Sequence, residues 1–286
     1  MKSPWPLSAA RVRGALCHAC RMEIEAYKPG NVSIHAPGHG MSAEDFLRSA
    51  EVSADALSRP GLRVGMRVLE AVRATRACVG CNTNLGILLL CAPLALAAQL
   101  DVAETNLRGR LRQVLDGLDR ADGEAVFEAI CIARPAGLGQ VQEYDVAAAC
   151  EVTLREAMQA ASDRDRIAHQ YVTDYVDVFD VGLPALQAQL TRSGDLGGLT
   201  WATVASYLAL LSRFPDTHIM RKFGTGIAEK VRIEAEGVAS AFKVCENSTD
   251  AARLLETFDK KLKREGINPG TSADLTVAGL LIHYLQ

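Results

Sequence analysis

The sequence predicts an all-α protein, a single large multi-helix bundle whose polar loops at the helix ends form one site. Hydrophobic residues make up 49% of the 286 residues but aromatic residues only 5%, so Ala, Leu and Val must fill the core, a composition typical of packed helices. Segments between breakers repeat apolar residues with helical spacing, and no stretch shows the alternation expected of a strand. No linker rich in Pro, Gly or Ser divides the chain, so we expect one domain over residues 1–286.

Breakers and caps place the individual helices. The first expected helix covers 9–26 and ends at the Lys28-Pro29-Gly30 turn. The segment Ser42-Ala43-Glu44-Asp45 starts the second, because serine caps backbone N–H groups and acids favour the first turn. In chain order, the remaining expectations are 42–57, 62–77, 85–99, 103–118, 122–133, 145–160, 163–179, 183–191, 199–212, 225–243, 248–264 and 272–284.

Charge and composition exclude several classes of function. A formal charge of −3 gives no electrostatic reason to expect nucleic acid or an anionic membrane as partner. The eight cysteines show no pattern of a secreted scaffold, and Met1 to Ala10 lacks a signal peptide. The apolar run Leu85 to Leu100 is too short for a membrane span. We therefore expect a cytoplasmic protein that acts on small molecules.

Two polar loops in the N-terminal part precede or follow apolar helices. In Tyr27 to Ser33, proline sets the turn and glycine permits positive φ, which leaves Lys28, Asn31 and Ser33 to face a ligand. The second loop, Gly80 to Gly86, contains Asn82, Thr83 and Asn84, any of which can cap the apolar helix that follows. The exposed N–H groups at such a helix start favour an anion such as phosphate.

Two further polar loops lie in the C-terminal part. Pro215 to Gly224 places an acid, an imidazole and two cations in about one turn, namely Asp216, His218, Arg221 and Lys222. Asn268 to Asp274 offers Thr271 or Ser272 as the cap of the last helix, with Asp274 in its first turn. Any one of these loops has a purely structural interpretation as a turn and a cap. Their shared composition favours one polar site at the helix ends.

A trio of acids is a candidate metal site. Asp174, Asp177 and Asp180 are spaced by three within an expected helix, which keeps neighbouring carboxylates on one face. Such carboxylates bind Mg²⁺, which usually shares its ligands with substrate phosphates. A solvated acidic face is the alternative.

Two other patterns have simpler interpretations. The C-x-x-C pairs at Cys17 and Cys20 and at Cys78 and Cys81 could together bind zinc, but their separation is unusual for such a site and core cysteines fit better. The Gly137-Leu138-Gly139 segment lacks the strand–helix context of a dinucleotide loop.

The four loops, in this order, resemble the triphosphoribosyl-dephospho-CoA synthase family. The corresponding stretches are Lys28-Pro29-Gly30-Asn31-Val32, Asn82-Thr83-x-x-Gly86, Asp216-Thr217 and Pro269-Gly270-x-Ser272-Ala273-Asp274-Leu275. The resemblance implies an all-helical fold and transfer of a triphosphoribosyl unit from ATP to a hydroxyl of dephospho-CoA, with release of adenine.

Departures from the family pattern indicate a divergent branch. Where the synthases continue with an Asp-Arg pair, this chain reads Val32-Ser33-Ile34-His35. Where they carry Asn-Thr-His-Lys-Gly, it reads Asn82-Thr83-Asn84-Leu85-Gly86, so Leu85 replaces a lysine. These forms are similar to those of archaea and of bacteria that use methanopterin-type cofactors.

Roles for the residues follow from the chemistry of breaking a C–N glycosidic bond through an oxocarbenium-like state. We expect Asp216 or Asp274 to stabilise the sugar cation or activate the acceptor, and His218 to move a proton. Lys28, Arg221 and Lys222 would hold phosphates, and Asp174 and Asp177 would hold Mg²⁺. The remaining substrate-binding candidates orient ribose or base or line the loops: Asn31, Ser33, Asn82, Thr83, Asn84, Asn268, Thr271 and Ser272.

Three functions remain open from the sequence. The first is the family reaction of ATP with dephospho-CoA. The second is transfer from a phosphoribosyl donor to the ribitol hydroxyl of a tetrahydromethanopterin precursor, which the replacement at Leu85 suggests. The third is a non-catalytic nucleotide-binding helical protein that regulates a partner. The sequence does not decide between a monomer and a homodimer.

Overall fold

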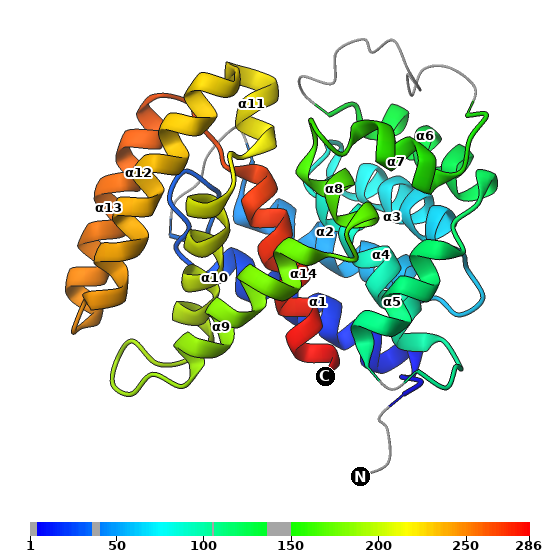
Figure 1. Cartoon of the computed structure of the whole chain (residues 1–286), viewed down its shortest axis with the longest axis horizontal. Helices are drawn as coiled ribbons and strands as arrows, with labels where there is room; N and C mark the ends of the chain where they lie inside the picture. Colours follow the sequence, from blue (N-terminus) through cyan, green and yellow to red (C-terminus); the bar gives the residue numbers. More distant parts are fainter. Residues whose placement is uncertain (1–4, 36–40, 105, 136–149) are drawn as a thin grey trace. The chain divides into compact units, whose positions relative to one another are not determined.

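The computed structural model describes residues 5–35, 41–104, 106–135 and 150–286. Over these residues the chain forms fourteen α-helices and one π-helix with no strand (Figure 1), which confirms the all-α prediction. The expected helix at 145–160 appears as a shorter helix from Leu154, and its residues 145–149, like the Gly137-Leu138-Gly139 segment, lie outside the described residues.

The chain divides into two compact units, and each is built from separate stretches of sequence. The first unit comprises Met1–Ala19, Leu47–Tyr175 and Leu281–Gln286, and the second comprises Cys20–Phe46 and Val176–Leu280. The expectation of one domain over the whole chain stays a prediction. The helices are α1 (Ala9–Glu25), α2 (Ala43–Leu57), α3 (Val64–Val79), α4 (Leu85–Gln99), α5 (Leu107–Asp116), α6 (Arg120–Ala133), α7 (Leu154–Ala161), α8 (Arg166–Val172), the π-helix η1 (Val178–Gly182), α9 (Leu183–Leu190), α10 (Leu199–Arg213), α11 (Thr217–Phe223), α12 (Thr225–Val244), α13 (Ser248–Arg264) and α14 (Gly270–Leu285).

Helix α4 lies at the centre of the first unit and is apolar on all sides. It packs against α3, α5 and α8, and nearly all of its residues are buried. Its interior Pro93 has no N–H, so the carbonyl of Leu89, four residues earlier, loses its helical donor. The buried Tyr171 hydroxyl donates to that carbonyl at 2.6 Å, and the Tyr175 hydroxyl donates to the next one, of Leu90, at 2.9 Å. The Tyr171 hydroxyl thus replaces the donor that Pro93 lacks, and the Tyr175 hydroxyl adds a bond to the neighbouring carbonyl.

The expected helix over 163–179 is interrupted at 173–175 and resumes from 176. Helix α8 ends at Val172, and Asp174 and Tyr175 follow in the left-handed region with φ of 52° and 59°. The turn places the Tyr175 ring beside that of Tyr171, with centroids 6.3 Å apart, where both hydroxyls reach α4. Burial of two phenols with partners outweighs the local helical pattern at this point.

Buried arginines close two helix ends in the first unit. The Arg67 side chain is fully buried and donates to the carbonyl of Leu62 at 2.8 Å and to that of Leu57, the last residue of α2. The Arg110 guanidinium donates to the carbonyl of Ala97 at 2.9 Å and to that of Leu100, at the end of α4. A cation at a helix C-terminus meets unpaired carbonyls and the negative end of the helix dipole. Burial lowers the pKa of Arg67 to about 10.

The second unit is built around α10, which packs against α9 and α12. A buried apolar cluster joins α10, α12 and α13 and includes Tyr207, Phe242 and Phe258, with Ala26 from the end of α1. Helices α12 and α13 form an antiparallel pair joined by a short loop (Figure 1). This core supports the loops at 27–33, 215–217 and 265–270, which contain five of the predicted site residues, namely Lys28, Asn31, Ser33, Asp216 and Asn268.

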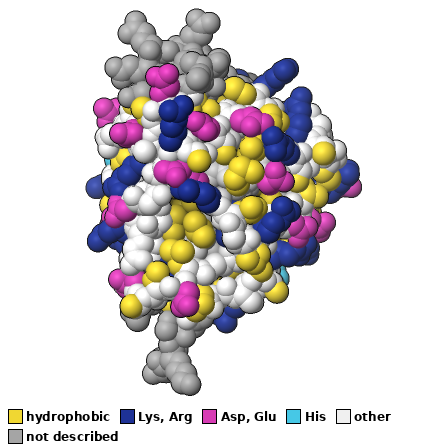
Figure 2. Space-filling model, turned by 90° about the vertical axis from the view of Figure 1, so that its right-hand side faces the viewer, with side chains coloured by type: hydrophobic (Ala, Val, Ile, Leu, Met, Phe, Trp, Pro, Cys, Tyr) yellow, Lys and Arg dark blue, Asp and Glu magenta, His cyan; other side chains and the backbone are white. Residues whose placement is uncertain are grey.

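Charged side chains on the face drawn in Figure 2 are mixed in sign, with Lys and Arg interspersed among Asp and Glu. This distribution agrees with the small net charge of −3. Within the described part of the chain, no helix combines the length and the apolar character that crossing a membrane requires.

Candidate active site

The Tyr27–Ser33 loop follows α1 and is anchored by its own lysine. Lys28 is 1% exposed, and its ammonium donates to the carbonyls of Glu23 at 2.6 Å and Val32 at 3.1 Å and pairs with the Glu23 carboxylate at 3.1 Å. Burial lowers the pKa of Lys28, an effect that Glu23 opposes, and burial raises the pKa of Glu23. In this structure Lys28 braces the turn, so its predicted phosphate contact stays a prediction that requires these bonds to break.

Gly30 sits at the tip of this loop and requires a glycine. Its φ is +80°, and a Cβ at this position would lie 2.9 Å from both Leu262 Cδ1 and Pro269 Cδ. Its N–H donates to Asp259 Oδ1 of α13 at 2.7 Å, and the preceding carbonyl, of Pro29, accepts from the Tyr207 hydroxyl at 2.7 Å. The backbone of the loop is therefore held from α10 and α13 at adjacent residues.

Asn31 and Asn268, both predicted site residues, are brought together. The Asn31 side-chain amide donates to Asn268 Oδ1 at 2.8 Å, and Asn31 is 7% exposed. Because the two residues are more than two hundred positions apart, this bond joins the first polar loop to the last one. Ser33, also predicted, is buried at the end of the same loop.

Asp216 joins the starts of two helices. One carboxylate oxygen accepts the backbone N–H groups of His218 at 3.0 Å and Ile219 at 3.2 Å, as the N-cap of α11. The other accepts the N–H of Ser272 at 2.7 Å and its hydroxyl at 2.8 Å, in the first turn of α14. Four hydrogen bonds engage this buried carboxylate. It acts as a double helix cap here, and its predicted catalytic role stays a prediction.

A second set of bonds links the same two helix starts. The hydroxyls of Thr217 and Thr271 lie 3.1 Å apart, and Thr271 Oγ1 also accepts the His218 N–H at 3.1 Å. The His218 ring packs on Gly270, where a Cβ would lie 3.3 Å from Nδ1. The loops 215–224 and 268–274 thus form one hydrogen-bonded cluster. The hypothesis of a common site requires that these two loops lie together.

The remaining candidates of the second unit lie near this cluster in sequence and are more open to solvent. His218, Arg221 and Asp274 are half-buried, and Lys222 is exposed with its ammonium 5.5 Å from the centroid of the Phe223 ring. His218, Arg221 and Lys222 come from α11, and Asp274 comes from α14. The prediction that Asp274 lies in the first turn of the last helix is wrong, because α14 begins at Gly270 and its first turn contains no acidic residue.

The Asn82–Asn84 loop belongs to the first unit and is described separately. Asn82 Oδ1 accepts the N–H of Leu85 at 3.1 Å, so Asn82 supplies the helix cap. The Thr83 hydroxyl donates to Ser49 at 2.7 Å and the Asn84 amide to Ser53 at 3.4 Å, both on α2. That this loop joins the same pocket as the others stays a prediction.

The acidic trio does not share a helix face, which corrects the argument made for it. Asp174 lies in the turn after α8, in the first unit, and its carboxylate pairs with Arg112 at 2.7 Å. Asp177 lies in the second unit, 2% exposed, just before η1. Among the described residues, no group of three or more His, Cys, Asp or Glu is placed to hold a metal ion. Mg²⁺ at Asp174 and Asp177 stays a prediction.

Several residues that anchor the site were not identified from the sequence. Asp259 and Glu23 look like surface acids of amphipathic helices, and Tyr207 looks like part of an apolar face. The only available signal was Tyr207, because a buried phenol needs a hydrogen-bond partner. Their partners come from loops distant in sequence, which no local pattern reveals.

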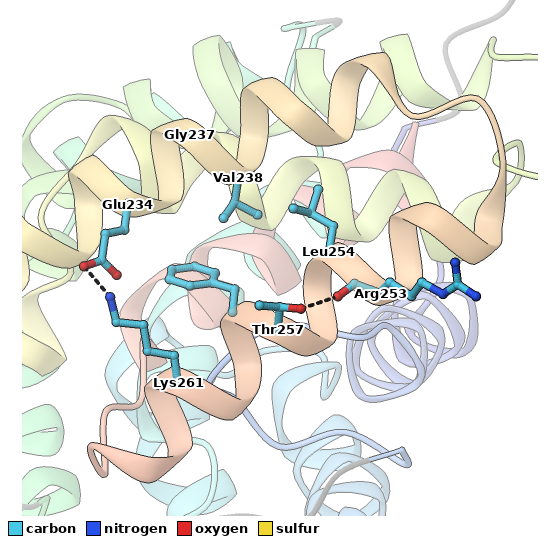
Figure 3. A pocket seen from close by; sticks show the side chains of 8 residues that line it. Glu234, Gly237, Val238, Arg253, Leu254, Thr257 and Lys261 are labelled. Carbon is cyan, nitrogen blue, oxygen red and sulfur yellow. Dashed lines mark hydrogen bonds and ion pairs between the residues drawn. The ribbon is translucent and has the colours of Figure 1, made fainter.

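A groove of about 590 Å³ between α12 and α13 lies apart from these residues (Figure 3). Val238, Leu254 and Phe258 line it, and the pair of Lys261 with Glu234, at 2.6 Å, spans it at one end. It contains none of the residues predicted from the sequence, and its lining is mainly apolar.

The fold and the cluster define an all-helical protein with a polar site at the starts of its helices. The model of the ATP:dephospho-CoA triphosphoribosyl transferase family (CitG) matches residues 9–286, and the chain belongs to this family. It is therefore an ATP-using transferase of the phosphoribosyl type.

A solved structure agrees with this assignment. The chain is similar to a crystal structure from Archaeoglobus fulgidus assigned as a triphosphoribosyl-dephospho-CoA synthase, with 26% identity and a TM-score of 0.63, over 82% of this chain and 96% of that one. No protein of curated function matches the chain significantly.

Proposed function

We propose that this chain transfers the triphosphoribosyl group of ATP to a hydroxyl of dephospho-CoA at the loop cluster of the second unit. The bond from ribose C1′ to adenine breaks, a bond from C1′ to the acceptor oxygen forms, and the acceptor's proton is removed as adenine leaves. Family membership over 9–286 supports the reaction. The observation that supports the location is the bonding of three loops to one another through Asp216–Ser272, Thr217–Thr271 and Asn31–Asn268.

Within this cluster we assign the acid–base chemistry to His218 and Asp274. His218 is half-buried, and its imidazole can pass a proton between acceptor and leaving base. Asp274 is half-buried near the start of α14, just after its first turn. Asp216 already accepts four hydrogen bonds, so we favour Asp274 as the carboxylate that faces the cationic sugar.

Arg221 and Lys222 would hold the triphosphate. They immediately precede α12, whose N-cap Gly224 supplies no side chain and whose first residues are exposed. Cations beside unpaired N–H groups suit a phosphate chain. Mg²⁺ bound to the nucleotide would neutralise further charge. Because Asp174 is paired with Arg112, we place no step of the reaction on a protein-held metal.

The replacement of a lysine by Leu85 supports a second acceptor, the ribitol hydroxyl of a methanopterin precursor. This residue takes the place of a lysine in the family pattern and is 8% exposed at the start of α4, so no cation replaces the missing one at that position. The chemistry at C1′ would be unchanged. A cytoplasmic location and a homodimer also remain predictions.

Adenine release tests the proposal directly. Purified protein with Mg²⁺-ATP and dephospho-CoA should form adenine and the triphosphoribosyl adduct in equal amounts by mass spectrometry. Adenine formed only with an aminophenyl-ribitol acceptor would replace the first acceptor by the second. Folded protein that binds ATP but releases no adenine with either acceptor would contradict the proposal and leave the non-catalytic hypothesis.

Variants then separate the assigned roles. His218→Ala should lower kcat by about 10²–10⁴-fold, the usual contribution of a general acid or base. Lys222→Ala should raise KM for ATP, whereas the control Lys243→Ala, at an exposed lysine near the other end of α12, should not.

Asp274→Asn should lower kcat with little change in Tm, and Asp216→Asn should lower Tm. The reverse outcome for the two aspartates would exchange their roles.

A further inference from the structure

Asp259 is a buried carboxylate that the proposed reaction does not use. It lies on α13 and is 4% exposed, yet three donors outside the helix ladder converge on it. These are the N–H of Gly30 at 2.7 Å, the hydroxyl of Tyr27 at 3.1 Å and the ammonium of Lys263 at 3.1 Å. Burying a carboxylate is costly unless it is bonded in this way. Two of its three partners belong to the Tyr27–Ser33 loop.

The bonds to Asp259 act together with those of Lys28 and Tyr207 to hold the conformation of this loop. Gly30 is left-handed, a conformation that leaves its N–H outside any helix or strand and in need of an acceptor. Asp259 Oδ1 provides that acceptor, while Oδ2 holds Tyr27 three residues earlier. One carboxylate therefore anchors both ends of the Tyr27-Lys28-Pro29-Gly30 turn.

Asn31 follows this turn directly, and its position depends on it. The Asn31 N–H donates to the Lys28 carbonyl at 3.0 Å, and this bond ties Asn31 to the turn. The side-chain amide uses one N–H for Asn268. The amide has a second N–H and an oxygen, and these are the groups with which Asn31 is expected from the sequence to orient ribose or base.

We infer that Asp259 is a positioning residue of the transferase. It fixes the turn at Tyr27 and Gly30 so that the Asn31 amide meets the nucleotide in one orientation, and the ion pair with Lys263 holds the buried carboxylate in place. The inference deepens the proposed function and rests on it. A small displacement of a substrate-positioning group can cost about 10²-fold in rate.

The alternative is that Asp259 only stabilises the packing of α13. A matched control exists at the start of the same helix, where the Asp195 carboxylate accepts the N–H of Ser248 at 2.9 Å and its hydroxyl at 2.6 Å. Asp195→Ala removes two hydrogen bonds to α13, from an exposed carboxylate, without touching the Tyr27–Ser33 loop. Stability lost at either site affects the amount of folded enzyme but not the kinetics of each folded molecule.

The test compares Asp259→Ala, Asp259→Asn and Asp195→Ala by kcat and KM for ATP per folded molecule and by equilibrium binding of Mg²⁺-ATP. We expect Asp259→Ala to lose about 10²-fold in kcat/KM. Asp259→Asn, which keeps an oxygen for the Gly30 N–H, should recover part of the loss, and Asp195→Ala should match the wild type. Asp259→Ala kinetics equal to those of Asp195→Ala would overturn the inference. If Asp259→Ala does not fold, Asp259→Asn and Tyr27→Phe are compared with Asp195→Ala in its place.

A double-mutant cycle shows whether Asp259 acts through Asn31. In the Asn31→Ala background, Asp259→Asn should cost little further kcat/KM, because the group that it positions is already absent. Full additivity of the two losses would contradict the inference. If the wild type releases no adenine, the proposed reaction fails separately, and the Mg²⁺-ATP affinities of the same variants decide whether the loop positions a nucleotide.

Discussion

At the scale of single residues, buried polar groups join segments of the chain that are distant in sequence. Pro93 removes the donor to the Leu89 carbonyl in α4, and the Tyr171 hydroxyl replaces it, while the Tyr175 hydroxyl donates to the neighbouring Leu90 carbonyl. In the second unit, the Tyr207 hydroxyl donates to the carbonyl of Pro29, and the Asp259 carboxylate accepts the N–H of Gly30. Each such pair connects distant segments because leaving a buried polar group unpaired is expensive.

Tyr171→Phe should lower the free energy of unfolding by about 1–3 kcal/mol, because it leaves the Leu89 carbonyl buried without a donor. Denaturant titration of the wild type and variant measures the loss. Pro93→Ala restores an N–H four residues after Leu89, so we expect it to recover part of the loss in the Tyr171→Phe background. Losses that simply add in the double variant would show that the phenol does not serve the proline site.

At the scale of elements, the helices are delimited by side chains at their ends. Helices α6 and α7 each begin with a capping box, formed by Asp119 with Asp122 and by Thr153 with Glu156. The N–H and hydroxyl of Thr153 both donate to the Glu156 carboxylate, at 2.8 Å each, and these bonds lower the pKa of Glu156. The start of α7 is therefore sensitive to acid.

The sign of this pH dependence follows from the lowered pKa. The folded pKa of Glu156 lies below its unfolded value, which is about 4.3 for a free glutamate. Its contribution to stability is complete above that value and is lost as the pH falls through the folded pKa. Glu156→Gln should thus lower Tm at pH 7 and make a smaller difference at pH 3.

Tm measured for both proteins across that range checks this expectation. Glu246→Gln, at an exposed residue between α12 and α13, is the control and should change Tm little at either pH. A difference for Glu156→Gln that is the same at pH 3 and pH 7 would contradict the role of the ionised cap.

At the scale of the whole molecule, the second unit is assembled from residues 20–46 and 176–280. The shorter stretch contributes the buried Ala26 and Val32 and the loop that bonds to Tyr207, Asp259 and Asn268. The longer stretch alone would expose these polar partners and the cavity left by the loop.

A fragment of residues 176–280 should therefore be helical but lack a cooperative thermal transition. Addition of a peptide of residues 20–46 should restore part of the cooperativity. Circular dichroism and calorimetry measure both. A sharp transition in the fragment alone would show that the Tyr27–Ser33 loop is not integral to the unit.

The sequence predicted the helix boundaries better than it predicted local breaks in the helices. Breakers and periodicity predicted most helices to within a few residues, for example 248–264 for α13. They failed at 173–175, where nothing local reveals that Tyr175 is required at α4. The pairs Asn31–Asn268 and Asp216–Ser272 confirm that three of the four predicted loops meet within the second unit.

The sequence by itself determined the all-α class, the positions of the polar loops and, through four ordered motifs, the family. These properties are local, since caps, turns and apolar periodicity act within a few residues. Only the tertiary structure decided that Asp216 joins α11 to α14, that Lys28 is buried with Glu23, and that Asp259 holds Gly30. Each depends on which distant group fills a hydrogen bond that burial would otherwise leave unmade, and the packing of the helices makes that choice.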